Sequence, residues 1–151
     1  MNDSIIHKNS VWSADQIERF LLQSEIPVRL GCLSASGAPL ICSVWYLYHE
    51  DAIWCATPKT AKLAVWLGRQ SRCAFEVAGD AMPYRGVRGQ GRATLSAADG
   101  PRILLQLIDR YLHSRESKFA QWLIARQAEE LAIRIEPEWL SAWDFSARMN
   151  G

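Results

Sequence analysis

The apolar residues of this chain recur at two periods, one typical of helices and one typical of strands. After Ser13 they lie three and four residues apart, and Gln16 stands at the third position after Ser13, as in a capping box. Three later stretches repeat the helical spacing, and on the last of them Phe119, Trp122 and Leu123 are expected to face the core. Helices are therefore predicted over residues 14–24, 60–69, 99–113 and 117–127.

The segments between these helices alternate in polarity or form short apolar runs, which is typical of strands. Turn-forming residues separate them, as at Ser36-Gly37 and His49-Glu50-Asp51. The predicted strands cover residues 28–34, 39–48, 52–57, 72–77, 84–96, 131–135 and 139–145, with a turn at 136–138 between the last two. Strands in hairpin order with inserted helices indicate a mainly β fold, either an antiparallel barrel or a rolled sheet.

Glycines interrupt the predicted strand 84–96 at positions 86, 89 and 91. Glycine within a strand indicates a bulge or the close approach of another backbone. Although their spacing resembles part of a dinucleotide-binding fingerprint, no helix follows, and that interpretation is discarded.

Length and charge restrict the class of protein. A chain of 151 residues suits a single domain, here residues 1–151 with a flexible stretch over 1–12. The formal charge is only +1, so Arg85, Arg88 and Arg92 indicate a half-exposed strand face, and neither nucleic acid nor a membrane is expected as a partner. Because an apolar leader and a run of 18 apolar residues are both missing, we expect a cytoplasmic protein with small-molecule or protein partners.

Residues for nucleophilic, acid-base or metal chemistry are sparse. The four cysteines lie singly in apolar stretches and are expected to be reduced core residues. His7, His49 and His113 are isolated from one another, so a metal site is not expected. The Gly-x-Ser-x-Gly pattern of serine hydrolases does not occur. An enzyme of this composition would leave the chemistry to a bound cofactor.

One turn concentrates groups that suit a phosphate. An apolar strand over 52–57 runs into Pro58, and a helix with an apolar face follows. Two hydroxyls and two ammonium groups stand in this region, those of Thr57, Lys59, Thr60 and Lys62. Unpaired amides at the start of the helix would add donors for a dianionic phosphate. The alternative is an ordinary solvated helix start that carries surface lysines.

The order of these pieces resembles the pyridoxamine 5′-phosphate oxidase-like family of flavin-binding split β-barrels. The matching segments are Arg29–Pro39, Ser43–Tyr46, Thr57–Lys62, Pro83–Ala93 and Ile135–Phe145. The resemblance implies an antiparallel split barrel that forms a homodimer. It also implies two FMN sites at the subunit interface, each built from both chains.

In that family a strand and a neighbouring strand end run beside the flavin, and a Ser/Thr-x-Lys motif in the next turn holds its phosphate. Here the motif is Thr60-Ala61-Lys62; the family often has arginine where this chain has Ala61, and Lys59 would supply the missing charge. Trp143 would approach from the partner subunit. The cofactor-binding residues that the resemblance implies are Ser43, Val44, Trp45, Ala56, Thr57, Lys59, Thr60, Lys62, Arg85, Arg88 and Trp143.

The implied activity is hydride transfer to or from a bound flavin, with an unknown small-molecule substrate. The vitamin B6 oxidase itself is a poor match, because its C-terminal Arg- and His-containing substrate segment has no counterpart after Trp143. One alternative is the deazaflavin F420, which also joins a phosphate to a flat ring. Another is a non-catalytic flavin- or haem-binding module, with His49 or His113 as the axial ligand of a haem.

Overall fold

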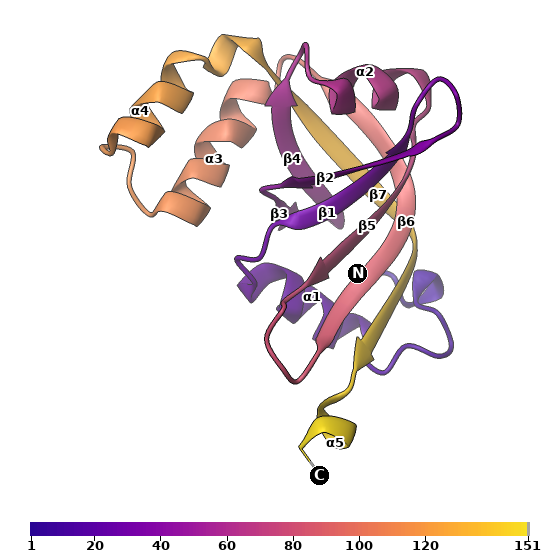
Figure 1. The fold of residues 1–151 in the computed structure, drawn as a ribbon. Coiled ribbons are helices and arrows are strands. Elements are labelled where there is room, and N and C mark those ends of the chain that lie inside the picture. Colours follow the sequence, from indigo (N-terminus) through magenta and orange to yellow (C-terminus); the bar gives the residue numbers. More distant parts are fainter. Residues whose placement is uncertain (151) are drawn as a thin grey trace.

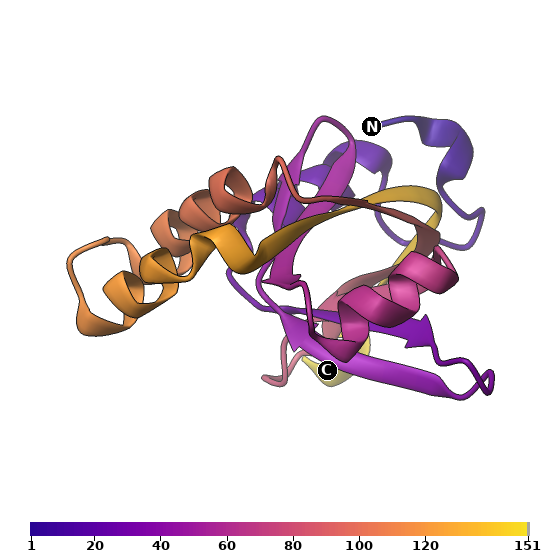
Figure 2. The same cartoon turned by 90° about the horizontal axis from the view of Figure 1, so that it is seen from above.

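The computed structural model describes residues 1–150 and contains one antiparallel sheet of seven strands (Figure 1). The strands are β1 (Val28–Leu33), β2 (Pro39–Val44), β3 (Leu47–His49), β4 (Ala52–Pro58), β5 (Arg72–Ala78), β6 (Arg85–Ser96) and β7 (Glu130–Asp144). Their spatial order is β2-β1-β5-β6-β7-β4-β3. Seen from above, the sheet curls around an interior, which confirms the mainly β, half-open barrel (Figure 2).

The helices occupy the ends and one side of this sheet. They are α1 (Ala14–Gln23), α2 (Lys62–Arg69), α3 (Gly100–Leu112), α4 (Lys118–Ala125) and α5 (Ser146–Met149), with the short 3-10 helices η1 (Asp3–Ile5) and η2 (Gln127–Glu129). Helices α1 and α2 lie at opposite ends of the curled sheet, whereas α3 and α4 project from its side as a helical hairpin (Figure 1). None of the helices in residues 1–150 combines the length and the apolar character that a membrane span needs.

Alternation along the strands separates a buried inner face from an outer face. One core cluster joins the inner residues of four adjacent strands, among them Leu30, Phe75, Val87 and Leu140. Helix α1 adds Ile17 and Leu21 to this cluster, and the predicted capping box of Ser13 and Gln16 is present at its start. The main core therefore forms from the apolar side chains that alternate with polar ones along these strands.

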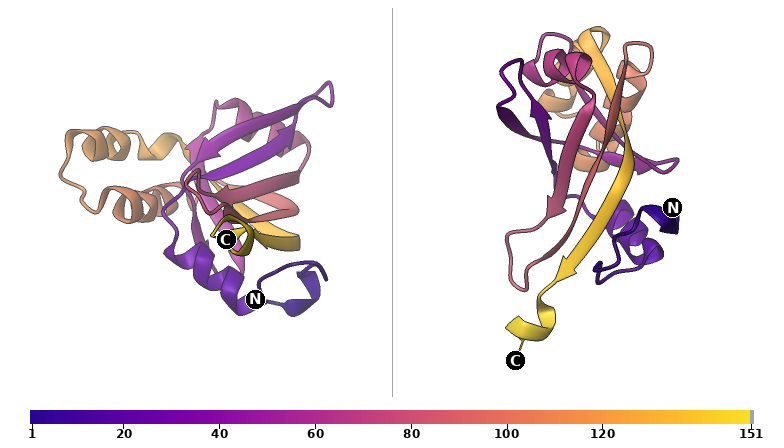
Figure 3. Two further views of the ribbon diagram at one scale, coloured as in Figure 1. Left: turned by 60° about the horizontal axis from the view of Figure 1, so that its bottom comes forward. Right: turned by 90° about the vertical axis from the view of Figure 1, so that its right-hand side faces the viewer.

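The predicted turn at residues 136–138 is wrong, because β7 is one continuous strand. It runs beside β6 along the height of the sheet (Figure 3). The pairing of Gln90 with Trp139 and of Gly91 with Pro137 leaves Glu138 as an extra residue on β7. Proline lacks the N–H that a regular ladder requires, and a bulge of this kind accommodates it.

The predicted strand 39–48 is interrupted. Strand β2 ends at Val44 and β3 begins at Leu47. Between them Tyr46 is fully buried; its amide donates to Tyr111 Oη at 3.2 Å, and its hydroxyl donates to Leu21 O at 2.8 Å. These bonds to helices replace strand pairing at this point.

The buried face predicted for residues 117–127 is wrong for its two aromatic residues, whereas Leu123 packs against the core as predicted. Phe119 and Trp122 are 51% and 53% exposed, and the fully buried residue of α4 is Ala120. Helix α4 packs through Ala120, Leu123 and Ile124 against Leu104 and other residues of α3. Phe119 lies at the margin of this contact, where its ring meets the ring of Trp45 edge-on at 6.1 Å between centroids.

Residues 1–12, for which the sequence predicts flexibility, lie against the barrel in this structure. Ile6 bridges to Leu140, and His7 N donates to Leu140 O at 2.8 Å. The N-terminal ammonium group lies 3.0 Å from the Asp51 carboxylate, whose hydrogen bond raises the pKa of that amine.

Candidate functional site

The turn from β4 to α2 presents hydroxyl and ammonium groups at one end of the barrel. Thr57 is buried, whereas Lys59, Thr60 and Lys62 are exposed. Lys59 N donates to Glu129 O at 2.9 Å and so ties the base of the turn to the end of η2. The turn is therefore anchored at its base and open to solvent at its tip.

The helix that follows this turn has no side-chain cap. Its N-cap is Ala61, which offers no acceptor, whereas Ser13 and Ser117 cap α1 and α4. The first three amides of α2 therefore have neither an intrahelical carbonyl nor a cap. Lys59 and Lys62 also form no ion pair within residues 1–150. Free amides, the positive end of the helix dipole and two ammonium groups together suit a phosphate.

The end of β2 lies near the end of β4. Val44 packs against the main core, and Trp45 and Ala56 both pack against the clusters that α3 and α4 contribute to. Trp45 stacks on Tyr111 with the ring centroids 5.0 Å apart and the planes 5° from parallel. The structure thus brings two predicted cofactor segments together beside the phosphate-suited turn.

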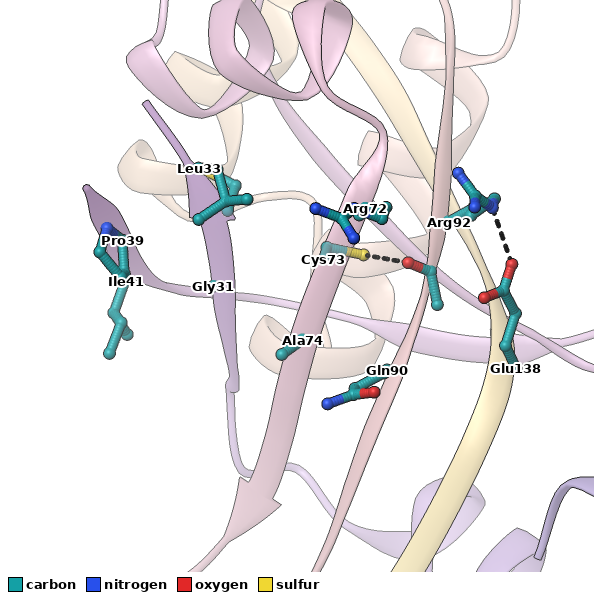
Figure 4. Close-up of a pocket in the computed structure, with 12 residues that line it drawn as sticks. Gly31, Leu33, Pro39, Ile41, Arg72, Cys73, Ala74, Gln90, Arg92 and Glu138 are labelled. Carbon is teal, nitrogen blue, oxygen red and sulfur yellow. Dashed lines mark hydrogen bonds and ion pairs between the residues drawn. The ribbon is translucent and has the colours of Figure 1, made fainter. Parts of the chain in front are cut away.

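The outer face of the sheet carries two adjoining cavities of about 640 and 420 Å³. Figure 4 shows the larger one, where small residues form the floor and the ion pair of Arg92 with Glu138, 2.9 Å, lies at one edge. One row of opposed residues crosses the floor: Ile41, Gly31, Ala74, Gln90 and Trp139. The neighbouring row is polar: Ser43, Arg29, Glu76, Arg88 and Ser141.

The outer face separates several of the predicted cofactor residues. Arg88 lies over the ring of Trp143, with 4.2 Å between the guanidinium carbon and the ring centroid. Ser43 shares a row with Arg88, but β1 and β5 lie between them, so their backbones are about 14 Å apart at the usual strand spacing. Arg85 leaves β6 on the opposite side from Arg88, because side chains three residues apart on a strand point to opposite faces, and it lines a cavity beside α1.

Glu130 is a buried acid near the turn that sequence analysis did not single out. It opens β7 opposite Pro58 and is 7% exposed. Burial raises the pKa of its carboxyl, and the charge of Arg126 partly offsets this effect. Because the folded-state pKa lies above the unfolded-state value, stability is expected to fall as the pH rises through that range.

Glu130→Gln is therefore expected to raise the free energy of unfolding near neutral pH, since it keeps the shape of the side chain and removes the buried charge. Urea denaturation between about pH 8 and pH 4 measures the effect, and the gain should shrink as the wild-type carboxyl takes up its proton. The exposed neighbour provides the control: Glu129→Gln should change little at any pH. A variant at position 130 that is less stable than the wild type at pH 8 would instead mean that the carboxylate makes a favourable ionic contact.

Neither a histidine nor a cysteine belongs to the β4–α2 turn. His49 and His113 are exposed and lie near Glu50 and Glu25, at 3.4 and 3.3 Å. All four cysteines are free thiols, and burial raises the pKa of Cys73 to about 12. Within residues 1–150, acidic, histidine and cysteine side chains do not gather into a group suited to a metal ion.

Comparison with solved structures shows which known fold this chain shares. No sequence profile of a known protein family matches the chain, and neither does any curated protein. A conserved hypothetical protein from Mycobacterium tuberculosis, Rv2991, is 23% identical with a TM-score of 0.76, and the match covers 91% of this chain and 88% of that one. An F420 reductase is 18% identical with a TM-score of 0.68, covering 80% and 93% of the two chains.

A third solved structure is a candidate pyridoxamine 5′-phosphate oxidase from Listeria innocua. It is 15% identical with a TM-score of 0.65, covering 87% of this chain and 97% of that one. Sequence identities at this level show that the fold is shared, and they do not show that the activity is. The chain has the split β-barrel fold of the pyridoxamine 5′-phosphate oxidase-like proteins, as its sequence predicts.

Proposed function

We propose that this protein binds a phosphorylated flat-ring cofactor, FMN or the deazaflavin F420, and uses it for hydride transfer with a small molecule. The observation that carries the proposal is the β4–α2 turn, where an uncapped helix start stands beside two lysines without acidic partners. Fold neighbours that include an F420 reductase and a candidate pyridoxamine 5′-phosphate oxidase support this choice of cofactor class.

The chain's own residues have separate roles in this proposal. Lys59, Thr60 and Lys62 hold the phosphate together with the first amides of α2. The segments Ser43–Trp45 and Ala56–Thr57 lie beside the ring and keep water from it. When bound, a flavin or deazaflavin supplies the hydride chemistry at its ring.

Two copies of the chain complete the site. Arg88 and Trp143 lie on the outer face and away from the turn of their own chain, so we assign them to the ring bound at the turn of a second copy. The outer face suits such a partner, because Ile41 is 70% exposed there. Beside it, the small side chains of Gly31 and Ala74 leave a hollow that a partner could fill. An isologous dimer would bury this face on both copies.

The visible absorption spectrum of freshly purified protein tests the proposal, with the released cofactor identified by mass and the oligomeric state measured by sedimentation equilibrium. A flavin or deazaflavin spectrum in a dimer supports it. A Soret band lost on replacing His49 or His113 would establish the haem alternative. A colourless protein that takes up neither FMN nor F420 would contradict the proposal, and a loaded protein that no donor reduces would be a carrier or sensor.

Lys62→Ala is expected to weaken binding of the identified cofactor by about tenfold to a hundredfold, because one charge-assisted hydrogen bond contributes about 1.5–3 kcal/mol. The fold should stay intact, since the side chain is exposed. Isothermal titration of the cofactor-free protein with FMN or F420 measures the change.

Lys118→Ala is the matched control. Lys118 also opens an eight-residue helix, but Ser117 caps that helix. Its replacement should leave the affinity unchanged. Equal affinities of both variants and the wild type would show that the phosphate does not bind at the β4–α2 turn.

A further inference from the structure

A small cavity of about 290 Å³ lies between α1 and the start of β6. Its lining consists of Trp12, Gln16, Arg19, Phe20, Gln23 and Arg85. The four residues from α1 recur at helical spacing, on a face next to the one that buries Ile17 and Leu21 in the core. The cavity is thus bounded by the side of α1 that the barrel leaves uncovered, the segment before it and one end of β6.

Two arginines line the cavity. Neither Arg19 nor Arg85 forms an ion pair within residues 1–150. Three acids flank these arginines outside the lining: Asp144 opposes Arg85 in the β6–β7 register, and Asp15 and Glu18 lie on α1 with Arg19. Hydrogen bonds from Ser146 keep the pKa of Asp144 low, helped by the charge of Arg85 and the indole of Trp12, so this carboxylate is ionised. The lining thus holds two guanidinium groups that form no ion pair and contains no carboxylate, which suits an anion.

The other walls are aromatic and amide groups. The rings of Trp12 and Phe20 have centroids 5.1 Å apart and are tilted by 49°, and both side chains are half-buried. Gln16 Oε1 accepts from Ser13 N at 2.9 Å, so the amide N–H groups of Gln16 are left as donors. A flat apolar ring would contact the aromatic walls, and an oxyanion would contact the guanidinium and amide groups.

We propose that this cavity is a binding site for a small aromatic carboxylate. A carboxylate matches the planar fork of a guanidinium, and Arg19 and Arg85 each offer one that forms no ion pair. The ring lies against Trp12 and Phe20. The site uses none of the residues of the β4–α2 turn, so it stands or falls separately from the cofactor proposal.

Benzoate is the probe for this site, and the indole N–H resonance of Trp12, assigned by its loss in Trp12→Phe, is the signal. Addition of benzoate to the full chain should shift this resonance saturably. Arg19→Gln and Arg85→Gln should each weaken binding about tenfold or more, as expected for loss of a charge-assisted hydrogen bond. Benzamide, which has the ring without the charge, should leave the resonance unchanged at the same concentrations.

Arg126→Gln is the matched control, because Arg126 also lies over an indole, that of the exposed Trp122, at 4.7 Å. It should not change benzoate binding at Trp12. The proposal would be overturned if benzoate did not shift the Trp12 resonance, or if benzamide shifted it as much as benzoate does. It would also be overturned if Arg19→Gln bound benzoate as tightly as the wild type, or if the Trp122 resonance shifted in parallel. If the Arg85→Gln variant does not fold, benzoate binding by the Arg19→Gln variant decides the question, since Arg19 is exposed.

Discussion

Gly91→Ala is expected to lower the free energy of unfolding by about 3 kcal/mol or more, because overpacking against a rigid neighbour cannot relax by a rotamer change. A Cβ at this position would lie 2.3 Å from Glu136 O and 3.2 Å from Pro137 Cα. Both atoms belong to the backbone of the adjoining strand, so β6 and β7 would have to separate at the bulge. Thermal unfolding should show a midpoint lowered by about 6–12 °C.

A second glycine shows what the same methyl group does where there is room. At Gly68, on α2, a Cβ would meet only Leu95 Cδ1 at 3.6 Å. Alanine is the better helix former, so Gly68→Ala should stabilise the protein by up to about 1 kcal/mol. Equal destabilisation by the two changes would contradict the argument from the β7 backbone.

Arg110→Met is expected to destabilise the protein by about 3 kcal/mol, because hydrogen bonds from a charged group contribute about 1.5–3 kcal/mol each and these are not additive. The Arg110 guanidinium, on α3, donates to Leu22 O at 3.0 Å, to Leu21 O at 3.1 Å and to Ser24 O. These carbonyls end α1, where the helix dipole favours a positive charge. Methionine keeps the apolar stem and removes all of these bonds. Urea denaturation measures the loss.

Arg115→Met separates this effect from that of an ordinary ion pair. Arg115 makes two hydrogen bonds of 2.8 Å to the carboxylate of Asp109, but both side chains are about half exposed. Exposed pairs contribute about 0.2–1 kcal/mol. A loss at position 110 no larger than that at position 115 would mean that water replaces Arg110 at the end of α1.

Features that depend on neighbouring residues in the chain could be predicted from the sequence. The capping box of Ser13 and Gln16 is local, and it is present. The hairpin order is also local, since turn residues separate the strands. The residues of the β4–α2 turn are contiguous, so their grouping could be anticipated without knowing the rest of the fold.

Features that depend on residues far apart in the chain could not be predicted from the sequence. Helical spacing places Phe119 and Trp122 on one face of α4, but it does not say that α3 covers this helix on the side that carries Ala120. Pro137 between two glutamates is typical of a turn, and only the pairing with Gly91, far away in the sequence, keeps it in a strand.

The same limit applies to the candidate site. The three-residue spacing of Arg85 and Arg88 places them on opposite faces of β6, but only the fold shows that Arg85 meets α1 and Arg88 meets Trp143. Glu130 lies in a run of polar residues, and nothing nearby marks it as buried. Tyr111 follows the apolar period of its helix, and its stacking under Trp45 depends on the break between β2 and β3.

The extra residue in β7 has a consequence for how this chain tolerates insertions and deletions. Before Glu138 the odd-numbered residues Ile133 and Ile135 point into the barrel, and after it the even-numbered Leu140 and Ala142 do. Loss of Glu138 would place Trp139 directly after Pro137, so every later residue would keep its present partner on β6 and its present face. If Glu138 were instead taken into the regular ladder, Trp139 and Trp143 would turn into a full interior and Leu140 would turn out into water. The bulge at this one surface residue therefore sets which side chains of the last part of β7 belong to the core and which are available for contact with a ligand or a second chain.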